Sequence, residues 1–319
     1  MRSWAALLAA VLVAGTIAGC DDDGAEPGAS QEATLVLDFQ PNAVHAGIYA
    51  ALGRGYYADE GLDLEIREPS SSTDAPKLLE AGRADLAIVD INDFGIALER
   101  GLELRAVAAV VQRPLAAVIA GDREQIVRPR DLEGGTVGVT GLPSDDAVLA
   151  AVLAADGADR SSVEPVTIGF ESVAALSAGR VDAATAFWNA EGVTLSRLGV
   201  PTREFRVDDY GAGAYPELLV VARQSSDDTT TTGFQSALAR AYAELGADPD
   251  AALADLLEQV PDLEEAEQAA QLRALTAADA FGAGEVEPKR VMDWLAFAGR
   301  YGIVDPAAVR ARLQTAVAD

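Results

Sequence analysis

The strongest constraint on the fold of this chain is an alternation of short β-forming runs with helical apolar patterns, which extends from Thr34 to Leu198. The run from Thr34 to Phe39 is rich in strand-forming residues, and from Val44 the apolar residues recur at helical spacing. Because strand, helix and strand in succession favour parallel pairing with a right-handed crossover, the alternation predicts an α/β fold.

The alternation falls into two series, which predicts two α/β lobes with a ligand cleft between them and a helical C-terminal tail. Gln112-Arg113-Pro114 separates the series, because proline cannot continue a central ladder. An apolar run at Leu218 to Ala222 follows the second series, so we expect the chain to return to the first lobe between Asp208 and Leu218. The predicted lobes are residues 33–112 with 218–319, and residues 113–217.

The first 20 residues carry Arg2, an apolar run and small residues before Cys20, which is the order of a secretory signal. The run is too short for a membrane-spanning helix. Ile17-Ala18-Gly19-Cys20 resembles the bacterial lipobox, in which the cysteine becomes the first mature residue and is acylated. We therefore expect a signal peptide over residues 1–19 and a protein anchored at the extracytoplasmic face of the cell membrane through acylated Cys20.

Residues 20–32 are acidic and small and lack apolar periodicity, so we expect a flexible tether before a folded body that begins near Ala33. Cys20 is the only cysteine, so no disulfide can form within the chain. The formal net charge of −27 repels phosphate backbones, which argues against nucleic acid as a partner.

Residues 34–66 include LDFQPNAVHAGIYAALGRGYYADEGLDLEI and resemble the opening of the NMT1/THI5-like group of substrate-binding proteins. This group has the type II periplasmic-binding fold, as do the sulfonate and taurine receptors. The segments FWNAEGV (187–193), DYG (209–211) and YPE (215–217) resemble the branch that binds thiamine pyrimidine precursors. The resemblance implies a receptor, expected to be a monomer, that closes on a small molecule and presents it to the permease of an ABC importer.

In that branch an aromatic residue and an Asn of the first loop, and a W/Y-N-x-E segment of the second lobe, face the ligand. The branch usually has Trp at the position of Phe39, and ring stacking survives this change. By position, the resemblance implies ligand contacts from Phe39, Asn42, His45, Trp188, Asn189 and Glu191.

The residue types point to a ligand site without the resemblance, because open parallel sheets bind ligands at the carboxyl ends of their strands. Aromatic faces stack on a planar ring, Asn offers a donor and an acceptor, and carboxylates accept hydrogen bonds from an amino group. The candidate ligand-binding residues are Asp38, Phe39, Asn42, His45, Asp90, Trp188, Asn189, Glu191, Tyr215 and Glu217.

Several candidates have a structural alternative, which stays open at this point. Phe39 and Trp188 could be core residues, and His45 could be an ordinary first-turn helix residue. Asn189 and Glu191 could begin a helix, where acceptors and negative charge are favourable. Asp38 and Asp90 could cap loops.

The segment Gly141 to Asp146 argues against an anionic ligand. Sulfonate and phosphate receptors need free helix N-termini and Arg or Ser/Thr donors. Here Asp145 and Asp146 place two carboxylates in the first helical turn, with Ser144 expected as the N-cap.

The eukaryotic relatives of this branch synthesise the pyrimidine with pyridoxal phosphate, a lysine, a histidine and a Cys-rich segment. This chain has only Lys77 and Lys289, and both lie outside the resembling motifs. Schiff-base chemistry needs a placed lysine, and the sequence shows no Ser-His-Asp series, zinc-ligand spacing or P-loop, so we expect no enzymatic activity, no cofactor and no metal.

The predicted ligand is a small planar nitrogenous molecule, best matched by a hydroxymethyl- or formylamino-pyrimidine precursor of thiamine. Riboflavin, a nucleobase, a polyamine or a sulfonate are alternatives. A binding module that serves a sensor rather than a transporter is another, as is a pyrimidine-synthesising enzyme.

Overall fold

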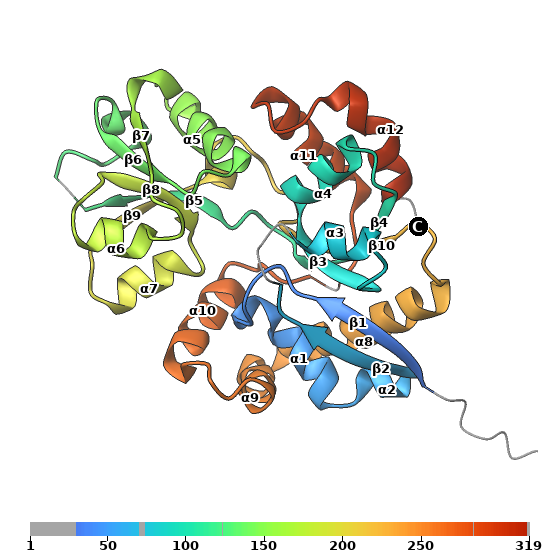
Figure 1. Ribbon diagram of the computed structural model, residues 1–319. Helices are drawn as coiled ribbons and strands as arrows, with labels where there is room; N and C mark the ends of the chain where they lie inside the picture. Colours follow the sequence, from blue (N-terminus) through green and yellow to red (C-terminus); the bar gives the residue numbers. More distant parts are fainter. Residues whose placement is uncertain (1–29, 70–73, 123, 283, 318–319) are drawn as a thin grey trace, which may run out of the picture.

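The structure is a computed structural model that describes residues 30–69, 74–122, 124–282 and 284–317. The predicted signal peptide, the predicted lipidation site at Cys20 and most of the predicted tether lie outside these residues. In the described part of the chain, two five-stranded sheets each form the centre of one α/β lobe (Figure 1).

The sheet of the first lobe has the strand order β2-β1-β3-β10-β4. Strand β1 pairs in parallel with β2 and β3, whereas β10 runs antiparallel to β3 and β4. Its strands are β1 (Gln31–Val36), β2 (Leu62–Arg67), β3 (Leu86–Asp90), β4 (Leu104–Val111) and β10 (Leu218–Arg223).

The sheet of the second lobe repeats this plan in the order β7-β6-β8-β5-β9. Strand β6 pairs in parallel with β7 and β8, and β5 runs antiparallel to β8 and β9. Its strands are β5 (Ala116–Gly121), β6 (Thr136–Val139), β7 (Glu164–Thr167), β8 (Ala183–Phe187) and β9 (Thr202–Arg206).

Both sheets are therefore mixed, whereas the alternation of strands and helices predicted parallel pairing. The chain crosses between the lobes twice. The first passage, residues 112–115, leads into the antiparallel strand β5, and the second passage, residues 211–217, leads into the antiparallel strand β10. Each passage enters its sheet without a preceding crossover helix, so the parallel rule does not apply to these strands.

Helices cover both faces of the first sheet. The first lobe contains η1 (Ala43–His45), α1 (Ala46–Gly53), α2 (Tyr56–Asp59), α3 (Ala75–Glu80), α4 (Ile91–Glu99), α8 (Asp228–Ala247), α9 (Pro249–Gln259), α11 (Pro288–Arg300) and α12 (Pro306–Ala316). The second lobe contains η2 (Pro129–Leu132), α5 (Pro143–Ala155), η3 (Arg160–Ser162), α6 (Ser172–Ser177), α7 (Glu191–Arg197) and η4 (Val207–Tyr210). None of the helices in the described residues is long and apolar enough to cross a membrane.

The C-terminal helices are integral to the first lobe. Helices α8 and α9 pack against α1, and α11 and α12 pack together with α12 against α4. Helix α10 (Glu265–Ala277) lies between the lobes, where it contacts α9, η1 and α7 (Figure 1).

The start of β1 and the presence of β9 differ from the sequence prediction. Strand β1 begins at Gln31, inside the predicted tether, because Gln31 and Glu32 pair with Leu62 and Asp63 of β2. Strand β9 was not predicted, because its sequence TREFR carries charged residues on an edge of the sheet. Helix α8 begins at Asp228, where the Asp227 side chain caps it by accepting a hydrogen bond from the Thr229 N–H.

Candidate ligand site at the junction of the two lobes

The loop after β1 is held by a chain of hydrogen bonds between three predicted site residues. The Asn42 side chain accepts from the Val44 N–H at 3.0 Å, and the Asn42 N–H donates to His45 Nδ1 at 3.2 Å. The fully buried His45 ring therefore carries its proton on Nε2, which donates to Asp38 Oδ1 at 2.9 Å. Asn42 and His45 thus fix the loop that carries Asp38 and Phe39.

Phe39 is the exposed residue of this loop. Its side chain is 47% exposed and lies near Phe170, which is 63% exposed, with ring centroids 6.2 Å apart. Phe39 follows β1 of the first lobe, whereas Phe170 follows β7 of the second, so the two rings face each other across the junction. Core packing is excluded for Phe39, because nearly half of its surface is accessible to solvent.

Phe170 was missed by the sequence reasoning. A signal for it existed, because Phe170 follows the strand-like run Val163 to Ile168 much as Phe39 ends the run that begins at Thr34. Aromatic residues just beyond strand ends are candidates for the edge of the sheet where ligands bind.

Trp188 has the opposite environment and is only 1% exposed. Its Nε1–H donates to the Pro114 carbonyl oxygen at 3.0 Å, and its backbone N–H donates to the Leu115 carbonyl oxygen at 3.0 Å. The Arg206 guanidinium lies 4.1 Å from the ring centroid, in cation–π geometry. These contacts give Trp188 a structural role where the chain passes from the first lobe to the second, and its contact with a ligand stays a prediction.

Asn189 and Glu191 lie at the start of α7. The Phe187 N–H donates to Glu191 Oε2 at 2.9 Å, while burial raises the pKa of the Glu191 carboxyl. Asn189 is buried at 2% exposure, and its Oδ1 has no hydrogen-bond partner among the described residues. Glu191 is thus occupied by its own loop, whereas Asn189 keeps an acceptor that no described donor uses.

Asp90 and Glu217 form a carboxyl pair beside the passages between the lobes. Asp90 caps α4 by accepting from the Asn92 N–H at 2.6 Å, and Glu217 accepts from the Leu115 N–H at 2.7 Å. The backbone brings the two residues side by side, because Leu218 pairs with Asp90 and the Ile91 N–H donates to the Glu217 carbonyl oxygen at 2.9 Å. Burial and the charge of Asp90 raise the pKa of Glu217 well above its ordinary value, and burial also raises that of Asp90.

The charge of Asp90 also affects the pKa of Asp93, a neighbouring residue of α4. Burial and, secondly, the charge of Asp90 raise the pKa of Asp93 to about 7.

Tyr215, another predicted site residue, is 1% exposed and its ring stacks on Phe297 at 5.8 Å between centroids. Carboxyl groups therefore gather near the junction, while Tyr215 belongs to the core of the first lobe.

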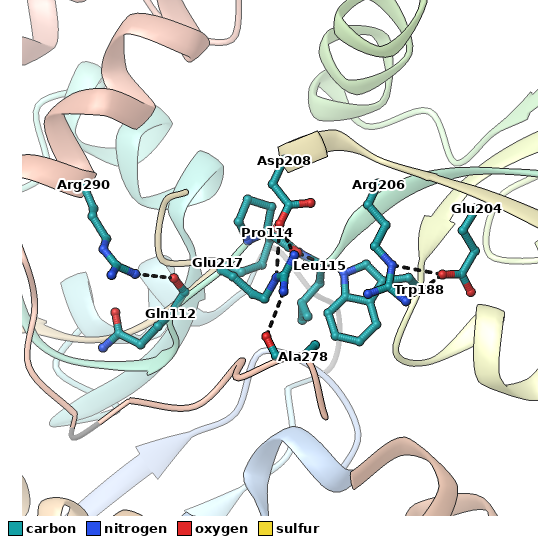
Figure 2. A network of polar contacts seen from close by, with 11 residues as sticks. Gln112, Pro114, Leu115, Trp188, Glu204, Arg206, Asp208, Glu217, Ala278 and Arg290 are labelled. Atoms are coloured by element: carbon teal, nitrogen blue, oxygen red, sulfur yellow. Dashed lines mark hydrogen bonds and ion pairs between the residues drawn. The ribbon is translucent and has the colours of Figure 1, made fainter. Parts of the chain in front are cut away.

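Polar contacts tie the C-terminal segment to the first passage between the lobes (Figure 2). Arg113 Nε donates to Asp208 at 3.1 Å, and Arg113 Nη1 donates to the Ala278 carbonyl oxygen at 2.8 Å. The Gln112 side chain donates to the Glu285 carbonyl oxygen at 2.7 Å, and Arg290 donates to the Gln112 carbonyl oxygen at 3.1 Å. The two passages and the tail thus form one connected network.

At the start of α5, where a sulfonate or phosphate receptor would bind its anion, the Asp145 carboxylate accepts the available hydrogen bonds. One oxygen of Asp145 accepts from the Thr140 hydroxyl at 2.6 Å and from the backbone N–H groups of Gly141 and Leu142 at 2.9 and 3.1 Å. The N-cap is Leu142 rather than the expected Ser144, because Pro143 takes the first helical position. The donors that an anion would need here are already used.

A hollow of about 500 Å³ lies within the second lobe rather than between the lobes. Its lining residues are Val166, Thr167, Ile168, Glu171, Arg180 and Val181, close in sequence to Phe170. Within the described residues, no three His, Cys, Asp or Glu side chains gather in a way that could hold a metal ion.

Two similar α/β lobes, joined by two passages and facing each other through exposed aromatic rings, define the class of two-lobed periplasmic-binding proteins. The model of the family described as NMT1/THI5 like matches residues 42–252, and the chain belongs to this family.

Individual relatives agree with this assignment. The chain is 33% identical over 256 residues to the formylaminopyrimidine-binding protein of Halalkalibacterium halodurans. The aligned region covers 79% of this chain and 77% of that protein. A 4-amino-5-hydroxymethyl-2-methylpyrimidine phosphate synthase of Saccharomyces cerevisiae is 28% identical over 109 residues, or 34% of this chain and 32% of the enzyme. The match to the binding protein is thus much longer than the match to the enzyme.

Among solved structures, the periplasmic aliphatic sulphonate-binding protein SsuA of Escherichia coli superposes with a TM-score of 0.72 at 14% identity. The superposition covers 90% of this chain and 98% of SsuA. It establishes the periplasmic-binding-protein fold.

Proposed function

We propose that this chain is the extracytoplasmic receptor of an ABC importer and that its ligand is a thiamine pyrimidine precursor bearing an amino group. The observation that carries the proposal is the exposed pair Phe39 and Phe170, which offers two aromatic faces from opposite lobes to one planar ring. The relative with formylaminopyrimidine in its name supports a ligand of this shape.

The carboxyl groups near the junction suit an amino-bearing ring. Asp38 accepts from His45, and Asp90 accepts from the Asn92 N–H, so both carboxyls are fixed in place before a ligand arrives. A carboxylate oxygen accepts hydrogen bonds from an exocyclic amino group, whereas it repels a sulfonate. The closed start of α5 also disfavours an anionic ligand, because Asp145 already takes its donors.

The mechanism is a shift of population between open and closed lobes. A ring that contacts both lobes makes more contacts in the closed form, so binding favours that form by the difference in affinity. The importer then recognises the closed protein. Acylated Cys20 would keep the receptor at the membrane surface, close to the permease.

A thermal-shift panel tests the ligand. It contains 4-amino-5-hydroxymethylpyrimidine, its formylamino relative, thiamine, riboflavin, a nucleobase, a polyamine and taurine. A ligand present at 100 times its Kd should add about 2.7 kcal/mol to the free energy of unfolding. Stabilisation by the aminopyrimidines supports the proposal, whereas stabilisation by taurine alone refutes it.

Recovery of the ligand tests the receptor class. After incubation with the protein and pyridoxal phosphate, the aminopyrimidine should be recovered unchanged, because Lys77 and Lys289 lie outside the proposed site. Consumption of the ligand would show an enzyme.

A further inference from the structure

Helix α10 connects the segments that carry the predicted site in the two lobes. It contacts η1, which ends at His45, and it also contacts α7, which begins at Glu191. In Figure 1, α10 lies beside α7 on one side and near α1, the helix that follows η1, on the other. A helix in this place can contribute side chains to anything bound at the junction.

The side-chain contacts set the register between α10 and α7. Arg197 pairs with Glu264 at 2.7 Å and with Glu267 at 2.6 Å, and the Thr194 hydroxyl donates to Glu267 at 2.6 Å. Moving back by three residues on α7 corresponds to moving forward by three on α10, so the helices run antiparallel. One further turn along α10 brings Gln271 toward the first residues of α7, which Asn189 precedes by two positions.

Three amide side chains near this register are buried with an unused acceptor. Gln268 and Gln271 are each 6% exposed, and Asn189 is 2% exposed. Gln271 donates its amide N–H to Glu267 at 3.3 Å. The carbonyl oxygens of all three side chains have no hydrogen-bond partner among the described residues.

An unused buried acceptor costs about 1–3 kcal/mol, so two of them on α10 and one just before α7, the helix that α10 contacts, need an explanation. Leu272 and Leu275, on the same side of α10, are buried in one apolar cluster with Ala43 and Val44 of η1. An amide in such surroundings gains most from a donor brought in by a ligand.

We propose that Gln268 and Gln271 of α10, together with Asn189, form the polar end of the ligand site and accept hydrogen bonds from N–H groups of the ligand. Three neutral carbonyl acceptors select a ligand that presents several N–H donors, such as an amino or formylamino group on a ring. The chemical nature of the ligand rests on the proposed function, whereas the placement of the glutamines rests on the contacts of α10.

The test replaces each glutamine by methionine, which has a similar length and no strong acceptor. The variants are Gln268→Met and Gln271→Met, and the control is Gln314→Met, at an exposed position of α12. Calorimetry with 4-amino-5-hydroxymethylpyrimidine and its formylamino relative gives Kd, and thermal unfolding gives the Tm of the ligand-free protein. We expect Kd to rise at least 10-fold in both site variants and to stay within 2-fold in the control.

The ligand-free Tm separates a binding role from a structural one. Gln268→Met removes an unused buried acceptor and should leave Tm unchanged or raise it, whereas loss of a structural glutamine should lower it. Gln271→Met also removes the hydrogen bond to Glu267, so this variant is judged by Kd alone. Unchanged Kd in both site variants, or a lowered Tm of Gln268→Met, overturns the assignment of the glutamines and leaves the receptor proposal intact. If the wild-type protein binds only another ligand of the panel, the pyrimidine proposal fails, and the same Kd comparison is made with that ligand.

Discussion

The two lobes share a strand order but use their strand ends differently. In the first lobe the loop after β1 exposes Phe39, whereas in the second lobe the loop after the equivalent strand β6 is closed by Asp145. The second lobe exposes Phe170 after β7 instead, and it buries Trp188 after β8. A common topology therefore supplies equivalent positions, and the local hydrogen bonds decide which of them remain available to a ligand.

The largest expected effect is on stability, at Trp188. Trp188→Ala should lower the free energy of unfolding by about 3–5 kcal/mol, because it removes a buried indole and its hydrogen bond to Pro114. Phe39→Ala, at an exposed ring, should change it by about 0.5 kcal/mol or less. Urea unfolding of both variants measures the difference. Similar losses in the two variants would abolish the contrast drawn between these aromatics.

The second effect is a pH dependence of the free energy of unfolding, which arises from Glu217 at the end of the second passage between the lobes. Because the folded-state pKa of Glu217 is raised, the folded protein holds a proton that the unfolded chain releases above its ordinary pKa near 4.5. Stability should therefore fall as pH rises from that value, by at most about 1.4 kcal/mol per pH unit for this group.

Glu217→Gln keeps the acceptor for the Leu115 N–H and cannot ionise. Its urea-unfolding free energy should decline less than that of the wild type between pH 5 and pH 8. Exposed Glu258→Gln on α9 is the matched control and should follow the wild type. Parallel curves for Glu217→Gln and the wild type would show that Glu217 does not hold the proton.

A third, smaller effect concerns ligand affinity at the exposed rings. Phe39→Ala and Phe170→Ala should each raise Kd for the aminopyrimidine by about 2- to 10-fold, since one aromatic contact contributes about 0.5–1.5 kcal/mol. Calorimetry on the single and double variants checks whether the two rings act on one ligand. Fully additive losses would argue against a shared ring between them.

The smallest effect is expected at the contact between α7 and α10. Arg197→Ala removes ion pairs with the exposed Glu264 and the partly buried Glu267, so the unfolding free energy should drop by about 0.2–1 kcal/mol. The loss should shrink in 1 M NaCl, because salt screens surface charges. A loss that is independent of salt would mean that packing rather than charge holds these helices together.

Much of the fold could be predicted because its signals are local. The two series of alternating strands and helices are present, and the apolar run Leu218 to Ala222 falls within β10. The antiparallel placement of β5 and β10 could not be predicted, because it depends on pairing between strands far apart in the sequence. Edge strand β9 lacked the apolar pattern by which strands are recognised.

The candidate site was less predictable, because exposure decides which residues are available to a ligand. The resemblance placed Phe39 and Trp188 together as aromatic candidates, yet burial separates them in the structure. Nothing local in the sequence showed that the Trp188 indole would donate to the Pro114 carbonyl oxygen or that Arg206 would pack on its ring. Gln268 and Gln271 escaped notice because their helical tail looked generic, and only its contacts with η1 and α7 give them a place near the site.

The position of β10 has a consequence for synthesis of the chain on the ribosome. Strand β10 lies between β3 and β4, so the first sheet stays incomplete until residues 218–223 have emerged. The strands of the second sheet all fall within residues 116–206, a continuous stretch that can fold as soon as it leaves the exit tunnel. The lobe that begins the chain is therefore the last to be finished, and until then β3 and β4 expose unpaired edges that a chaperone could cover.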